Sequence, residues 1–173
     1  VMRSRGFAKG KRGDRVLLYM QNSPQFVLAY YGILRANAVV VPVNPMNMTT
    51  ELRHYVKDSG ARVVVADRAR IERLQPIAGR HALQIISVDD CGGLAIAHTP
   101  FTAVIAEFAG AAMPAVDVSL DDFATIMYTS GSTGQPKGVM QSFNSISQVA
   151  EAIVANVEEI VGVSKENRML SYL

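Results

Sequence analysis

The chain has 173 residues, enough for one compact core, and 49% of them are hydrophobic while 18% are charged, which excludes a disordered or low-complexity protein. Its 17 basic and 15 acidic side chains nearly balance, so the overall charge indicates no particular partner. The first ninety residues carry 14 basic and 7 acidic side chains, whereas residues 91–173 carry 3 and 8. We interpret the basic N-terminal stretch as a solvated face, and no nucleic-acid partner is predicted.

The cysteine count and the hydropathy of the sequence indicate where in the cell the protein is expected to be located. Cys91 is the only cysteine in the sequence, so no intramolecular disulfide and no cysteine-based zinc site can form. This usage fits a reducing cytosol, and a cytoplasmic location is expected. The longest uncharged apolar stretch, Leu17–Leu34, is interrupted by polar residues around Pro24, so no transmembrane segment is predicted.

The first ninety residues alternate between strand and helix signals. Runs of consecutive apolar residues, typical of strands buried on both faces, predict strands at Arg15–Met20, Ala38–Val43, Val63–Ala66 and Leu83–Val88. Three helices are predicted between them, with Ser23, Thr49 and Asp67 as N-caps and Asn37, Gly60 and Gly79 at or beyond their ends. This alternation predicts an α/β fold, a partly parallel sheet with helices on both faces.

The second half of the chain is less regular. It predicts a short helix at Ala103–Ala109, a linker at Met113–Val118, a strand at Phe123–Tyr128, a loop at Thr129–Gly138 and a strand at Arg168–Leu173. Ser142 can cap a long helix with an apolar stripe of period 3.6 over Phe143–Val161. We therefore divide the chain into a strand–helix part (1–110), a linker (111–122) and a last part (123–173). Because the chain stops within an apolar strand, truncation is expected.

The segment Tyr128–Val139, YTSGSTGQPKGV, carries the chemistry. It combines two glycines, four hydroxyl side chains and a lysine that follows a proline. Backbone N–H groups and hydroxyls of such a loop form a concave set of donors, and the lysine adds a positive charge, so a polyphosphate is the expected ligand. The segment is not the G-x-x-x-x-G-K-[ST] motif of kinases and GTPases, because Pro136 precedes Lys137 and Gly138 follows it. A hairpin loop without a ligand is the alternative.

YTSGSTGQPKGV resembles the phosphate-loop signature of the adenylate-forming ligases, which include acyl-CoA synthetases, peptide-synthetase adenylation domains and luciferases. GDRVLLYMQNSPQFVLAYYGILRANAVVVPVNP and TTELRHYVKDSGARVVVAD resemble two earlier regions of that family, and RMLSYL resembles the strand before its Pro-Leu-x-His stretch. The resemblance spans nearly the whole chain and is closest to the fatty-acyl or medium-chain acyl-CoA synthetases. It identifies residues 1–173 as a fragment of the N-terminal AMP-binding domain, without the C-terminal domain.

The resemblance implies a reaction and a set of site residues. A carboxylic acid, expected to be a fatty acid, would react with MgATP to give an acyl-adenylate and pyrophosphate, and the thiol of coenzyme A would then displace AMP. The β- and γ-phosphates would be held by Thr129, Ser130, Gly131, Ser132, Thr133, Gly134 and Lys137. Lys137 is the expected catalytic residue, because its charge would stabilise the departing pyrophosphate electrostatically.

The sequence also departs from the family pattern. Phe143 stands where the family often has His, which predicts a more apolar acyl pocket wall, and Asn37 stands where it usually has Gly. The Tyr-Gly-x-Thr-Glu and Thr-Gly-Asp elements are absent from these residues. We therefore expect the fragment alone to be inactive, and its apolar faces to favour self-association.

Two other functions remain open. One is an amino-acid or aryl-acid adenylation domain, whose substrate-lining residues would differ mostly beyond residue 173. The other is a short nucleotide- or phosphate-binding module without turnover. His54, His81 and His98 lack the spacing of a metal site, so no protein metal site is predicted, and the absence of a G-x-S-x-G motif leaves a serine hydrolase unsupported.

Overall fold

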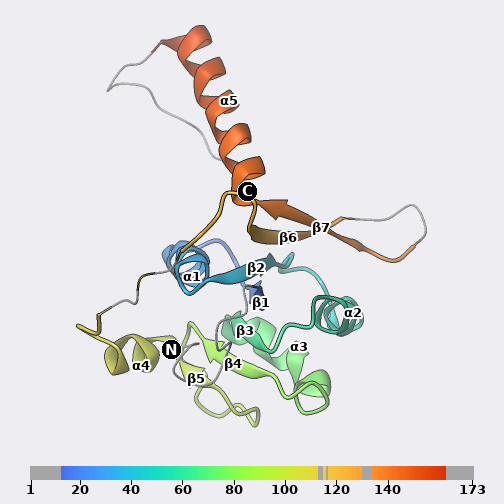
Figure 1. The fold of residues 1–173 in the computed structure, drawn as a ribbon. Coiled ribbons are helices and arrows are strands. Elements are labelled where there is room, and N and C mark those ends of the chain that lie inside the picture. The colour runs from blue at the N-terminus through green and yellow to red at the C-terminus, as the bar shows by residue number, and fades with distance from the viewer. Residues whose placement is uncertain (1–12, 113–114, 116, 130–133, 163–173) are drawn as a thin grey trace.

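The computed structural model describes residues 13–112, 115, 117–129 and 134–162 (Figure 1). Its strands are β1 (Asp14–Tyr19), β2 (Ala38–Pro42), β3 (Val63–Ala66), β4 (Gln84–Ser87), β5 (Thr99–Pro100), β6 (Phe123–Thr129) and β7 (Lys137–Ser142). Its helices are α1 (Pro24–Arg35), α2 (Thr49–Ser59), α3 (Arg68–Ala78), α4 (Phe101–Glu107) and α5 (Phe143–Val161). The predicted strand at 168–173 and the basic stretch before residue 13 lie outside the described residues.

Within these residues the strands form one seven-stranded sheet in the order β5-β4-β3-β1-β2-β6-β7. All neighbours pair in parallel except β6 and β7, which form an antiparallel hairpin. β1 lies in the middle, with Val16 opposite Val40 on one side and opposite Val63 on the other. The predicted α/β class with a partly parallel sheet is therefore confirmed.

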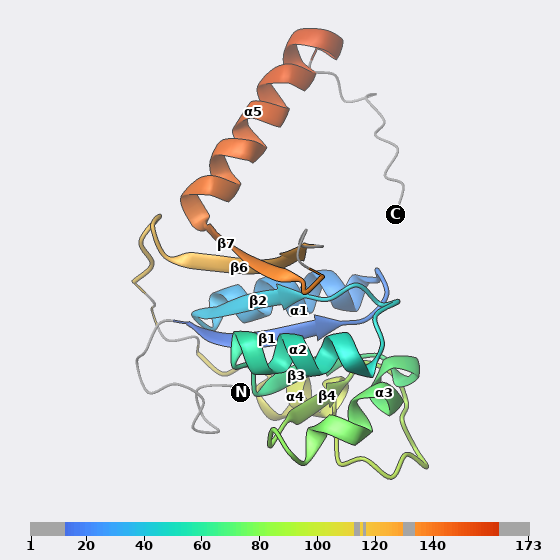
Figure 2. The ribbon, with the colours of Figure 1, turned by 90° about the vertical axis from the view of Figure 1, so that its right-hand side faces the viewer.

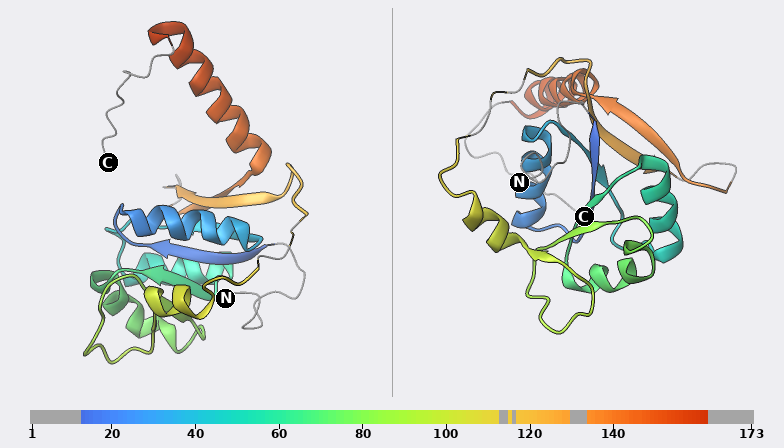
Figure 3. Two further views of the ribbon diagram at one scale, coloured as in Figure 1. Left: turned by 90° about the vertical axis from the view of Figure 1, so that its left-hand side faces the viewer. Right: turned by 60° about the horizontal axis from the view of Figure 1, so that its bottom comes forward.

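Helices cover both faces of the sheet. Figures 2 and 3 show α2 and α3 on one face and α1 and α4 on the other. Successive side chains of β1 enter different cores, since Leu17 packs with the residues of α2 and α3 while Leu18 packs with those of α1. Both side chains have an exposed fraction of 0%, which explains why this strand reads as a continuous apolar run.

The helix ends follow the predicted capping residues in all but one case. The Ser23, Asp67 and Ser142 side chains accept hydrogen bonds from backbone N–H groups three residues later. Gly60 ends α2 with a φ of 67°, and Asn37 adopts a φ of 59° after α1. The prediction for Thr49 was wrong, because α2 starts there and Met48 is its N-cap. The hydroxyl of Thr49 instead donates to the carbonyl of Arg73 on α3.

Two strands were not predicted. β5 has only two residues, too few for a period to be recognised. β7 occupies the last three residues of the segment Tyr128–Val139 and the three residues after it, where the local sequence KGVMQS has no strong alternation. The structural reason for β7 is its pairing with β6, in which Met127 lies opposite Val139 and Ile126 opposite Met140.

Helix α5 extends away from the sheet at the end of β7 (Figure 1). The helix has the predicted length, but no other described element covers its apolar side chains. Val149, Ile153, Val154 and Ile160 have exposed fractions of 60%, 53%, 55% and 80%. No helix in the described part of the chain combines the length and apolar character that crossing a bilayer requires.

Candidate functional site

The predicted phosphate loop joins the two strands of the β6–β7 hairpin. Thr129, the last residue of β6, lies directly opposite Lys137, the first residue of β7. Gly134 adopts a φ of 87°, a conformation that favours glycine. Thr129, Gly134 and Lys137 are all exposed. The other four predicted site residues, Ser130, Gly131, Ser132 and Thr133, lie outside the described residues.

Gly138, which was not among the predicted site residues, is required by close packing. A Cβ atom at this position would lie 2.8 Å from Cγ2 of Ile126 and 3.4 Å from two ring atoms of Tyr128. Tyr128 is also the cross-strand partner of Gly138, so its ring covers the space that a side chain would otherwise fill. Because Gly138 has only a hydrogen atom in place of a side chain, β7 can pass beneath the Tyr128 ring at this residue.

The β6 strand is attached to helix α2 through Tyr128. The Tyr128 hydroxyl donates a hydrogen bond of 2.6 Å to Oδ2 of Asp58. Its ring packs on Tyr55, with centroids 4.2 Å apart and an interplanar angle of 32°. Burial, followed by the hydrogen bond and the negative charge of Asp58, raises the pKa of Tyr128 above its ordinary value, so this hydroxyl remains a donor at neutral pH.

The β7 strand is attached to the same helix through His54. Nε2 of His54 lies 2.8 Å from the carbonyl oxygen of Pro136, the residue immediately before Lys137. Because a carbonyl oxygen can only accept, Nε2 is the donor in this contact. The His54 ring also lies edge-on to Tyr128, with centroids 6.0 Å apart. Helix α2 therefore contacts β6 and the residue that leads into β7.

Helix α2 is itself anchored in the core. The side chains of Leu52, Tyr55 and Val56 are buried against the sheet, with exposed fractions of 0%, 6% and 2%. Its first residue, Thr49, is bonded to α3 through the Arg73 carbonyl at 3.0 Å. The helix thus presents His54 and Asp58 to the hairpin from a fixed position.

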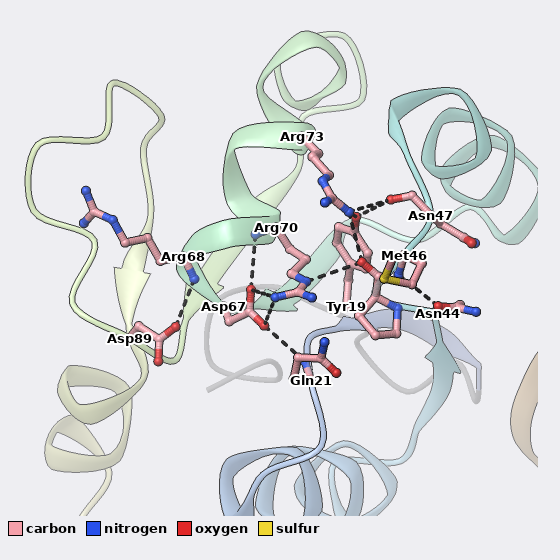
Figure 4. A network of polar contacts seen from close by, with 11 residues as sticks. Tyr19, Gln21, Asn44, Met46, Asn47, Asp67, Arg68, Arg70, Arg73 and Asp89 are labelled. Carbon is pink, nitrogen blue, oxygen red and sulfur yellow. Dashed lines mark hydrogen bonds and ion pairs between the residues drawn. The ribbon is translucent and has the colours of Figure 1, made fainter. Parts of the chain in front are cut away.

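A polar network lies where the parallel strands end at their carboxyl edge (Figure 4). Asp67, which follows β3, accepts from the backbone N–H of Gln21 beyond β1 at 3.1 Å and forms an ion pair with Arg70 at 3.2 Å. Arg73 donates to the Tyr19 hydroxyl at 3.0 Å and to the carbonyl oxygens of Pro45 and Asn47 at 3.0 and 3.1 Å. These contacts hold the segment that leads into α2.

The described part of the site has the chemistry of an anion-binding loop. It offers an exposed ammonium group, an exposed hydroxyl and a glycine with a positive φ at one end of a hairpin. No group of three or more His, Cys, Asp or Glu residues that could hold a metal ion occurs in the described ranges. His54, His81 and His98 lie on α2, after α3 and before β5 respectively.

Sequence reasoning found the loop but not its supports. His54 and Asp58 lie on the exposed side of a helix whose apolar stripe is the stronger signal, and their partners are 82 and 70 positions away along the chain. Nothing local in the sequence connects them. The sequence offered a signal only for Gly138, because an aromatic side chain on one strand can cover a glycine on the next, as Tyr128 does here.

The chain is similar to a known enzyme family and to characterised proteins. The family model described as AMP-binding enzyme matches residues 2–173. The long-chain-fatty-acid–CoA ligase FadD13 of Mycobacterium tuberculosis is 32% identical over 158 residues, which cover 91% of this chain and 30% of that protein. The 3-hydroxybenzoate–CoA/4-hydroxybenzoate–CoA ligase of Thauera aromatica is 34% identical over 153 residues, covering 84% and 27%.

A solved structure has the same fold. The ATP-bound crystal structure of MatB from Rhodopseudomonas palustris superimposes with a TM-score of 0.68 at 26% identity, and the match covers 89% of this chain and 29% of that one. The chain therefore spans less than a third of the length of each of these three proteins.

Proposed function

The chain belongs to the AMP-binding enzyme family, and on that premise we propose that it is part of an ATP-dependent acid–thiol ligase that forms AMP. In this function a carboxylate attacks the α-phosphorus of ATP, the bond to pyrophosphate breaks, and the thiol of coenzyme A then displaces AMP from the acyl-adenylate. The relatives named above are CoA ligases, which supports this class of reaction. The single structural observation that carries the proposal is the exposed Lys137 opposite Thr129 at the mouth of the hairpin.

The chain's own residues would act on the phosphates. Lys137 supplies positive charge, Thr129 a hydroxyl donor and Gly134 a backbone that can turn toward the ligand, a donor set that fits a polyphosphate. Ser130, Gly131, Ser132 and Thr133 complete the proposed site. Lys137 would act catalytically by stabilising charge on the departing pyrophosphate, not by moving a proton. Magnesium would arrive with ATP, and we assign no residue of this chain to the metal or to coenzyme A.

The identity of the acid is a finer proposal. The relatives differ, one being named for long-chain fatty acids and the other for hydroxybenzoates. We propose a fatty acid as the substrate, supported by the match that covers the larger share of the chain, with an aryl acid as the second candidate. Phe143, which starts α5 behind the hairpin, is consistent with an apolar neighbourhood for either acid.

The organisation of the chain is likewise proposed. We infer that residues 1–110 and 123–173, joined by a linker at 111–122, are one fragment of the N-terminal domain, and that the fragment alone is inactive. β6 pairs with β2, so residues on both sides of the linker contribute to one sheet. The coverage of about a third of each relative supports a longer parent, in which further residues would contact adenine, ribose and coenzyme A. We also propose that the protein is located in the cytoplasm.

The test is ATP–pyrophosphate exchange by the protein that the longest reading frame containing this chain encodes. Exchange that depends on an added fatty acid is expected, with AMP and acyl-CoA as products when coenzyme A is present. Exchange that requires an aryl acid instead would select the second candidate. Binding of ATP without exchange on either class of acid would reject the ligase function and favour a nucleotide-binding module.

A further inference from the structure

One histidine of helix α2 is bonded to the backbone next to the lysine of the hairpin. His54 Nε2 donates to the Pro136 carbonyl at 2.8 Å, and β7 begins at the following residue, Lys137. Proline has no backbone N–H, so its carbonyl is the one polar group through which this residue can be held. The proline ring already restricts the φ angle of Pro136. The hydrogen bond from His54 therefore fixes a residue that has little conformational freedom left.

Lys137 pairs with Thr129 across the hairpin, but its side chain has no hydrogen-bond or ion-pair partner among the described residues. Its side chain is exposed, and among the described strands β7 lies at the edge of the sheet, paired on one side by β6. The position of its Cα atom therefore depends on how the hairpin is held as a whole. Edge strands open more readily than central ones, because fewer buried contacts and fewer shielded hydrogen bonds restrain them.

Helix α2 attaches the two strands of the hairpin through different residues. Asp58 holds β6 through the hydroxyl of Tyr128, whereas His54 holds β7 through the carbonyl of Pro136. His54 is thus the α2 residue whose hydrogen bond falls on the residue immediately before the strand that bears the cation. It is partly buried and sits between Leu52 and Tyr55, whose buried side chains keep the helix in place.

From this geometry we propose that His54 is a positioning residue, which sets the location of Lys137 and thereby the affinity of the loop for the polyphosphate of the nucleotide. The inference rests on the proposed function of the loop and deepens it, by naming a residue that acts without touching the ligand. Because Lys137 is proposed to hold the phosphates and to stabilise the departing pyrophosphate, loss of the hydrogen bond should weaken ATP binding and also lower the rate of exchange.

The test compares His54→Ala, His54→Gln and Arg53→Ala in the protein encoded by the longest reading frame. Arg53 is the matched control, an exposed neighbour on the same helix. For His54→Ala we expect the Kd and KM for ATP to rise about 3- to 10-fold, the change that loss of one net hydrogen bond produces. The kcat of pyrophosphate exchange should also fall, but by less than in Lys137→Ala, because the lysine keeps its charge and loses only its fixed position.

The glutamine variant separates positioning from general stability. Its side-chain amide can donate to the Pro136 carbonyl, so affinity for ATP should return to within about twofold of the wild type, even if the smaller side chain lowers the Tm. Amide hydrogen exchange supplies an independent measurement. The peptide 137–142 should exchange faster in His54→Ala than in the wild type, with β1 unchanged.

The outcomes distinguish the two proposals. Weaker ATP binding in His54→Ala, with no pyrophosphate exchange in the wild type, would support positioning and reject the ligase. Normal exchange in the wild type, with the Kd and KM of His54→Ala unchanged, would overturn the positioning role and leave the ligase intact. Unchanged hydrogen exchange of residues 137–142 would also overturn it. A wild-type protein that binds neither ATP nor pyrophosphate would reject both.

Discussion

Tyr128 of β6 and Asp58 of α2 are joined by a hydrogen bond of 2.6 Å although 70 positions of sequence separate them. The bond ties the antiparallel hairpin, at the edge of the sheet, to a helix that is packed on its centre. The tyrosine ring also covers Gly138 and contacts Tyr55. One side chain therefore contributes both to the packing between the hairpin strands and to their attachment to helix α2.

Replacing Tyr128 with phenylalanine should change how stability depends on pH. The folded-state pKa of Tyr128 is raised above 10.0 by burial first and then by Asp58, so the folded protein binds this proton more tightly than the unfolded chain. Its contribution to stability is complete below about pH 10 and is lost as the pH rises further. Tyr128→Phe cannot ionise, so urea unfolding between about pH 9 and 11 should show a shallower decline.

At neutral pH the same substitution should lower the free energy of unfolding by up to about 1 kcal/mol, because the hydrogen bond is partly solvated and the ring remains. Tyr31→Phe is the control, since Tyr31 is 62% exposed on α1. Identical pH slopes for Tyr128→Phe and the wild type would show that the bond to Asp58 does not persist in solution.

Gly138→Ala should destabilise the hairpin. The new methyl group would lie 2.8 Å from Cγ2 of Ile126, and a β-branched side chain cannot rotate that atom away without leaving its rotamer. Overpacking of this kind costs about 1–3 kcal/mol. The measurement is the free energy of unfolding in urea.

Gly79→Ala provides the matched control, because a Cβ there meets nothing within 4 Å and the backbone is right-handed helical. That variant should be neutral or slightly more stable. The double variant Gly138→Ala/Ile126→Ala should lose less than the sum of its two single changes, since the clash is removed. Strict additivity would contradict the contact.

Lys137→Ala should weaken the adenylation half-reaction of the parent protein. Loss of the ammonium group removes charge stabilisation of the departing pyrophosphate, and a decrease of about tenfold or more in pyrophosphate exchange is expected. Lys57→Ala, an exposed lysine on α2, should exchange normally. Normal exchange by Lys137→Ala would remove this residue from the proposed site.

Asp67→Ala should lower global stability. Asp67 is 9% exposed, caps α3 and accepts from Gln21 and Arg70, so its removal takes the acceptor from two partly buried N–H groups and the carboxylate partner from the Arg70 guanidinium. A loss of about 2–4 kcal/mol is expected in urea unfolding. Asp67→Asn keeps an acceptor for the cap and should lose less. A change below about 0.5 kcal/mol for the alanine variant would contradict the network.

The 173-residue chain on its own should self-associate through α5. Ile153 and Val154 are each more than half exposed, and adjacent exposed apolar residues favour contact with a second copy. Light scattering after size-exclusion chromatography should show a mass that rises with concentration, and Ile153→Lys should reduce it. A monomer at all concentrations, with or without the substitution, would reject this prediction.

The sequence was most informative where structure is local. The strand at 63–66 was predicted with its observed bounds, and Ser23, Asp67 and Ser142 were identified as caps, because an N-cap depends on atoms within three residues. Thr49 failed as a cap since Met48 takes that position and the Thr49 hydroxyl instead bonds to α3. The strand β7 was missed because its pattern is weak and its partner, β6, decides its conformation.

The amino-acid sequence by itself determined the α/β class, the strand–helix rhythm and the Gly-rich segment with Lys137, because hydrophobic period, caps and turn residues act over a few positions. Only the tertiary structure decided that this segment is the end of an edge hairpin and that His54 and Asp58 of α2 hold its two strands. Those contacts join residues 82 and 70 positions apart, and they form because the sheet order brings β6 and α2 together. No local preference of the chain encodes that proximity.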